Sequence, residues 1–164
     1  MFSADLLFLD WYVENEMKRY GDISFGDMIT KTDGEKLPEI INQNISRKRI
    51  YTTFIAWDEY SRQNFDFIPV GIVYAVVPRG NVEKVKLLRN NEKLWEQYRL
   101  QDLEFKIYDN SQVNNLIFHY AESLNNIGVT YHNLGHDPEA KLFLNKSLNL
   151  YDDPEVVTNL KAIK

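Results

Sequence analysis

Residues 124–140 read LNNIGVTYHNLGHDPEA, and this stretch decides the fold of the C-terminal third of the chain. Leu124, Ile127 and Tyr131 follow one another at spacings of three and four, which is the spacing of one face of a helix. Gly135 then ends the apolar pattern, as glycine commonly does after a helix because it tolerates a positive φ. The stretch therefore predicts a helix that ends in a glycine turn.

A second helix is predicted directly after this turn. Asp137 can cap it, and Pro138 suits its first position because proline fixes a helical φ and needs no amide donor there. We therefore expect one helix over residues 111–134 and an antiparallel partner helix over residues 138–150.

The order of these residues resembles the tetratricopeptide repeat, a unit of about 34 residues built from two antiparallel helices. The match covers residues 120–163 and runs through Leu124-x2-Ile127-Gly128-x2-Tyr131, then Leu134-Gly135, then Glu139-Ala140. The resemblance implies a packing set, with Gly128 facing Ala140, that consists of Leu124, Gly128, Tyr131, Gly135, Ala140 and Leu144. The chain departs from the family pattern at Leu124 and Leu144, where aromatic residues are usual, and at Ser147, where alanine is usual. The plainer alternative is an amphipathic helical hairpin with a glycine turn.

In such repeats the first helix of each hairpin lines the partner-binding face, which implies a set of contact residues. They are Glu122, Asn125, Val129, His132 and Asn133. Their helical spacing places them on one side, and none is a Lys or Arg, so they offer hydrogen bonds and no basic clamp. The implied partner is a protein or peptide segment, one candidate being the rest of the same polypeptide. A face that is merely solvated is the equal alternative.

Before residue 81 the chain alternates between strand-like and helix-like stretches. Strands are expected over residues 5–9, 49–57 and 70–77, and helices over residues 11–20, 37–46 and 57–64. This order predicts an α/β class, with α+β as the alternative: a small three-stranded α/β domain followed by the helical hairpin. We assign residues 1–80 to that domain, residues 81–110 to a connecting helical segment that packs on it, and residues 111–164 to the tetratricopeptide-like helices.

The order of the whole chain is also similar to the soluble C-terminal region of bacterial membrane glycosyltransferases of the protein-mannosyltransferase type. The stretches that carry this resemblance are DLLFL at 5–9, WY at 11–12, DMI at 27–29, RIYTTF at 49–54 and GIVY at 71–74. The resemblance implies a parent protein whose catalytic membrane spans precede this segment. The segment itself would then be non-catalytic and extracytoplasmic, whereas a free-standing interaction module is expected in the cytoplasm.

The composition of the chain argues against several classes of partner and site. The chain carries a net charge of −5 and no large basic cluster, which argues against nucleic acid as a partner. It has no cysteine, which excludes disulfides and thiolate metal sites. The longest nearly uncharged run, residues 67–78, is far shorter than the roughly 20 residues of a membrane-spanning helix, so we expect no span in this segment.

The sequence predicts no catalytic residue, metal site or cofactor. His132 and His136 are four residues apart, but the turn at Gly135 should separate them, and no motif pairs a nucleophile with a base. One alternative is an enzyme whose active site lies in the α/β part, at the carboxyl ends of the strands near Asp10 and Trp57.

Overall fold

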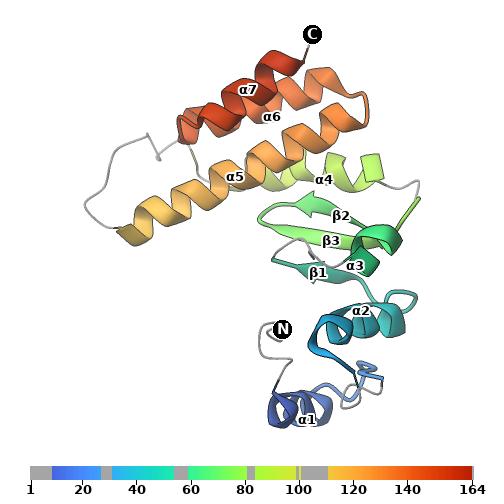
Figure 1. The fold of residues 1–164 in the computed structure, drawn as a ribbon. Helices are drawn as coiled ribbons and strands as arrows, with labels where there is room; N and C mark the ends of the chain where they lie inside the picture. Colours follow the sequence, from blue (N-terminus) through green and yellow to red (C-terminus); the bar gives the residue numbers. More distant parts are fainter. Residues whose placement is uncertain are drawn as a thin grey trace.

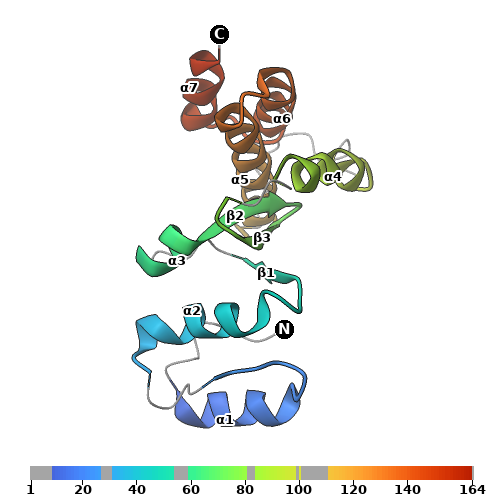
Figure 2. The ribbon, with the colours of Figure 1, turned by 90° about the vertical axis from the view of Figure 1, so that its right-hand side faces the viewer.

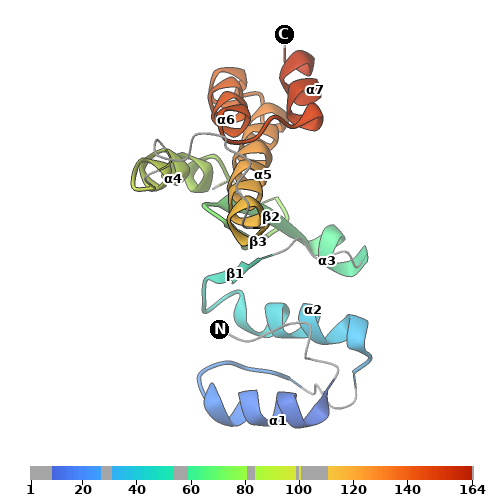
Figure 3. The same cartoon turned by 90° about the vertical axis from the view of Figure 1, so that its left-hand side faces the viewer.

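The computed structural model describes residues 9–26, 31–53, 59–80, 84–98, 100 and 111–163. In chain order the elements are α1 (Asp10–Arg19), α2 (Asp33–Asn44), β1 (Ile50–Thr52), α3 (Glu59–Asn64), β2 (Phe65–Val70), β3 (Val73–Pro78), α4 (Lys84–Glu96), α5 (Ser111–Asn133), α6 (Asp137–Leu150) and α7 (Pro154–Ala162). They are stacked from α1 at one end to α7 at the other, with the small sheet between (Figure 1). Figures 2 and 3 show that α2 lies on one side of the sheet and that α4 and α5 lie on the other.

The sheet has three antiparallel strands in the order β1-β3-β2 and is followed by helices, which confirms the predicted fold class. Because every strand pair is antiparallel, the arrangement corresponds to the α+β alternative. The strand expected over residues 70–77 is wrong in detail, because β2 and β3 form a hairpin around a turn at Gly71, where φ is 62°. The unbroken run of apolar side chains concealed this turn. The strand expected over residues 5–9 lies outside the described residues except for Leu9, which precedes α1 as its N-cap.

Helix α2 begins four residues earlier than predicted, at Asp33 instead of residue 37. The reason is a capping box that the sequence analysis missed: the Glu35 carboxylate accepts hydrogen bonds from the Thr32 amide at 3.0 Å and from its hydroxyl at 2.7 Å. Pro38 therefore lies inside the helix, not at its start. The helices expected over residues 11–20 and 57–64 are present as α1 and α3. Of the strand expected over residues 49–57, Ile50–Thr52 form β1, residues 49 and 53 are outside it, and residues 54–57 lie outside the described part.

One face of the sheet packs on α2. Ile50, Val76 and Phe67 lie in register across the three strands, and all of them contact the cluster that contains Ile41 of α2. A separate small cluster around Val13 joins α1 to the far side of α2. The N-terminal part of the molecule is thus a stack of thin layers.

The opposite face of the sheet joins a larger core shared with α4, α5, α6 and α7. This cluster contains Ile68 of β2 together with Leu88 and Trp95 of α4. The segment expected to be a connector on the α/β part therefore supplies a helix, α4, that also contributes to the core of the C-terminal helices. The sheet and the helical hairpin consequently share one hydrophobic core.

A buried asparagine fixes α4 to the β2–β3 turn. Asn91 is 0% exposed, its Oδ1 accepts from the Gly71 amide at 2.7 Å, and its Nδ2 donates to the Pro69 carbonyl at 2.8 Å. Both backbone groups would otherwise be buried without a partner, which carries a cost of about 1–3 kcal/mol for each. This contact therefore sets the position of the sheet relative to the C-terminal helices.

Candidate functional site

Helices α5 and α6 form the antiparallel hairpin that the sequence predicted. The two helices are very close at Gly128, where a Cβ atom would lie 2.7 Å from Leu144 Cγ and 3.1 Å from the Ala140 carbonyl oxygen. Leu124, Tyr131, Ala140 and Leu144 are each 0% exposed. A larger side chain at residue 128 would therefore push the helices apart, and the hairpin depends on glycine at this position.

The turn between the two helices follows the prediction at Gly135, where φ is 78°, but differs at the cap. The N-cap of α6 is His136 and not Asp137. Asp137 lies in the first turn of α6, where its Oδ1 is 2.7 Å from His132 Nδ1. The carboxylate thus links the end of α5 to the start of α6 instead of capping the second helix.

Tyr131 occupies the interior of the hairpin. Its ring stacks on Phe143, with centroids 5.7 Å apart and planes at 20°, and its buried hydroxyl makes no close hydrogen bond in the described part of the chain. Burial, followed by the negative charges of Glu92 and Glu139, raises the pKa of Tyr131 to about 12. The hydroxyl therefore stays protonated at neutral pH in the packed interior of the hairpin.

The residues expected to contact a partner do not share one open face. Asn125 is only 7% exposed, and its Oδ1 accepts a hydrogen bond from Asn159 Nδ2 of α7 at 3.0 Å. Val129 is half-buried against the large core cluster. Helix α7 thus covers part of the side of α5 that was expected to be free.

The remaining members of that set have three different surroundings. His132 forms the contact with Asp137, and Asn133 is exposed at the end of α5. Glu122 is exposed as well and borders a cleft. Of the five expected contact residues, the structure therefore leads to Glu122 as the one placed beside a concave surface.

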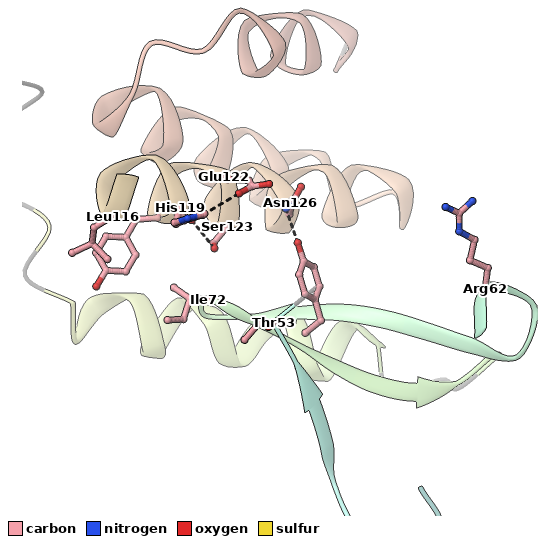
Figure 4. A pocket seen from close by; sticks show the side chains of 10 residues that line it. Thr53, Arg62, Ile72, Leu116, His119, Glu122, Ser123 and Asn126 are labelled. Carbon is pink, nitrogen blue, oxygen red and sulfur yellow. Dashed lines mark hydrogen bonds and ion pairs between the residues drawn. The ribbon is translucent and has the colours of Figure 1, made fainter. Parts of the chain in front are cut away.

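This cleft, of about 740 Å³, lies between α5 and the sheet (Figure 4). Helix α5 contributes Leu116, His119, Tyr120, Glu122, Ser123 and Asn126. The sheet side contributes Thr53, Arg62, Ile72 and Tyr74. Its walls thus come from segments that are far apart in the sequence, and the cleft exists only when α5 is docked on the sheet.

A polar bridge spans the cleft. Asn126 Nδ2 donates to Tyr74 Oη at 2.7 Å and so joins α5 to β3. Burial, and next the negative charge of Glu122, raise the pKa of Tyr74, whereas the hydrogen bond from Asn126 lowers it. Because the Tyr74 oxygen is the acceptor in this bond, its own proton can be donated to a ligand.

The α5 wall also carries charge. Glu122 Oε2 lies 3.5 Å from His119 Nδ1, and the side chains are 52% and 68% exposed respectively. The Ser123 hydroxyl is already engaged, because it donates to the His119 carbonyl at 2.8 Å. Glu122 therefore presents a partly solvated carboxylate to the cleft.

The cleft was not predicted from the sequence, although the residues of its α5 wall follow a recognisable helical spacing. Leu116, His119, Ser123 and Asn126 recur at spacings of three and four and mark a third side of α5, apart from the hairpin seam and the α7 side. The other wall carries no comparable signal, because residues such as Ile72 belong to a turn that was not predicted.

The residues that the structure describes were also compared with the requirements of a metal site. Within them, no three His, Asp or Glu side chains are grouped as metal ligands would be. His132 and His136 are separated by the turn, as expected, and each lies beside its own carboxylate, Asp137 or Glu139. The alternative site near Asp10 and Trp57 cannot be placed on a strand end, because Asp10 begins α1 and residues 1–8 and 54–58 lie outside the described part.

No protein-family model, no curated protein and no solved structure matches the chain. Of the helices in the described residues, none has both the length and the apolar character that crossing a bilayer would require. The resemblances to the tetratricopeptide repeat and to the membrane glycosyltransferases therefore stay predictions.

Proposed function

We propose that this chain is a protein-interaction module in which tetratricopeptide-like helices form a rigid frame and an exposed side of α5 contacts a protein or peptide segment. The observation that carries the proposal is the hydrogen bond between Asn125 and Asn159, whose positions are 34 apart in the chain. A repeat of this type is about 34 residues long, so the two asparagines occupy the same position in successive units. Helix α7 thus corresponds to the first helix of a following repeat.

The packing of α5 agrees with such a frame. Its hairpin side is filled by α6, and Asn125 lies under α7, so these two sides serve the internal structure. The side toward the sheet carries the cleft and remains accessible. A helix held in place by α6, α7 and the sheet can present the side chains that line the cleft to a partner at low entropic cost, because its own position is already fixed.

The alternative of a non-catalytic region of a membrane glycosyltransferase stays a prediction, since nothing in the described residues favours it over a free-standing module. The interaction module is tested with the intact, isotopically labelled chain and peptides selected on it from a phage-displayed random library. We expect at least one peptide to bind with a Kd in the micromolar range and to shift backbone amide resonances along α5. Selected peptides that shift only amides of α1 and α2, or a selection without binders, would contradict the proposed function.

A further inference from the structure

The cleft between α5 and the sheet has an apolar end. Leu116 of α5 and Ile72 of the β2–β3 turn line it from opposite walls and are 50% and 48% exposed (Figure 4). Covering two such side chains is favourable, because it removes apolar surface from water. The volume of about 740 Å³ falls within the range of about 300–1,000 Å³ that is usual for ligand pockets. The cleft can thus take a few side chains, but not a whole folded partner.

The same wall carries a negative charge at a fixed distance from this apolar end. Glu122 follows Leu116 by six positions on α5, which corresponds to about 9 Å along the helix axis. The two residues are also about 120° apart around the helix, so an extended peptide, which advances about 3.3 Å per residue, needs at least about three residues to reach from one to the other. The partly exposed Glu122 carboxylate would gain a charge-assisted hydrogen bond from a Lys or Arg side chain at that place.

Two further features restrict the ligand. The Tyr74 hydroxyl accepts from Asn126 and can donate its own proton to a peptide carbonyl. Arg62 lies at the far end of the cleft from Leu116 (Figure 4) and limits its length there. The net charge of −5 favours the approach of a basic segment, because opposite charges steer association.

We infer that the cleft binds an extended peptide segment that places an apolar side chain between Leu116 and Ile72 and a Lys or Arg side chain on Glu122. The inference rests on the proposed function, since it assigns a surface and a ligand chemistry to the interaction module. It also replaces the partner face expected from the repeat resemblance, most of which is covered or engaged within the chain.

The test uses the intact chain and synthetic copies of the library-selected peptides, with fluorescence polarisation as the readout. We expect the selected sequences to share an apolar residue and a Lys or Arg at least about three positions apart. Leu116→Ser should weaken binding about fivefold through lost apolar contact, and Glu122→Gln about threefold, as for a partly exposed ion pair. The matched controls are Leu142→Ser, at a leucine of α6 that is 47% exposed, and Glu14→Gln, at an exposed glutamate of α1.

A charge exchange separates recognition from general damage to the fold. Glu122→Lys should abolish binding of the basic peptide and restore binding of the same peptide with its Lys or Arg changed to Glu. Should Leu116→Ser lower the melting temperature, Ile72→Ser tests the same apolar end from the sheet side. The cleft assignment is overturned if peptides shift α5 amides but bind the Leu116, Ile72 and Glu122 variants with the same Kd as the parent chain. That result would leave the interaction module standing. Equal losses with the two control variants overturn it as well, and a selection without binders overturns both proposals.

Discussion

The two ends of the molecule are held together in different ways. Around α4 to α7 a single core cluster connects four helices and reaches Ile68 of the sheet, and residues such as Leu124 and Ile127 are 0% exposed. Around α1 and α2 the apolar clusters are small and separate. The C-terminal helices therefore form the stable framework of the molecule, and the N-terminal layers are attached to it through the sheet.

Polar contacts supplement the thin N-terminal clusters. Asn44 of α2 donates to the Ser24 carbonyl at 2.6 Å and accepts from the Ser24 amide at 2.9 Å, which holds the segment after α1. Lys48 pairs with Asp22 and lowers the pKa of that carboxyl. Because Asp22 and its partner are at the surface, this ion pair adds little stability. From this comparison we predict that the same kind of substitution lowers the free energy of unfolding more at the C-terminal end than at the N-terminal end.

The largest difference is expected for truncation of buried side chains. Leu144→Ala should destabilise the chain toward the upper end of about 2–5 kcal/mol, because its cavity is enclosed by two packed helices. Ile40→Ala, at a 3% exposed residue of the small α1–α2 cluster, should fall toward the lower end of about 2–5 kcal/mol, because thin layers can collapse around it. Chemical denaturation of both variants measures the two losses. Equal losses would show that the two regions are packed with the same tightness.

The next largest loss of stability is expected at the contact between α5 and α6. Ala140→Leu should cost about 1–3 kcal/mol by overpacking, because Ala140 is 0% exposed beside Gly128. The control is Ala162→Leu, at an exposed position at the end of α7, which should change stability by less than about 0.5 kcal/mol. A thermal melt of Ala140→Leu that matches the parent chain would contradict the seam.

The junction between the two regions depends on Asn91. Asn91→Ala leaves the Gly71 amide and the Pro69 carbonyl without their partner and should cost about 1–3 kcal/mol. Hydrogen exchange should speed up most at the β2–β3 turn, because the lost bonds lie there. Asn90→Ala, at the exposed neighbouring residue, is the matched control and should leave exchange at the turn unchanged. Faster exchange throughout α5 and α6, with the turn unaffected, would speak against this role.

The comparison also explains what the sequence could predict. The hairpin of α5 and α6 was located within a residue or so at the turn, because Gly135 and Pro138 constrain the backbone directly and leave few alternatives. The β2–β3 turn was missed because Gly71 sits in a run of apolar residues that reads as one strand. Local backbone signals were thus reliable where they coincided with a change in hydrophobic pattern.

The cleft was beyond the reach of the sequence for a different reason. Its walls meet only because Asn91 and the shared core dock α4 and α5 on the sheet, and no local pattern encodes that contact. The expected partner face failed at Asn125 because α7 was not anticipated as a neighbour with its own hydrogen bond to that residue. Long-range packing therefore decided which side of α5 stays open.

The smallest effect at neutral pH is expected for Tyr131→Phe, and it grows in alkali. The buried hydroxyl makes no close hydrogen bond in the described residues, so its removal should change stability by less than about 1 kcal/mol at pH 7. The pKa of Tyr131 is raised from 10.0 to about 12 in the folded chain, chiefly by burial. Below pH 10 the tyrosine is protonated in both states, and its contribution to stability is fully present. Between pH 10 and 12 the unfolded chain loses this proton while the folded chain keeps it, so stability falls as the pH rises.

Phenylalanine lacks this proton, so Tyr131→Phe should lose less stability than the parent chain over that alkaline range. The measurement is the difference in free energy of unfolding between parent and variant from pH 8 to pH 12, in which the titration of all other groups cancels to first order. Tyr51→Phe, at a tyrosine that is 48% exposed on β1, is the control for the same substitution outside the core. A flat difference for Tyr131→Phe would mean that the ring is less enclosed than the α5–α6 seam implies, and the contrast between the two ends of the molecule would shrink accordingly.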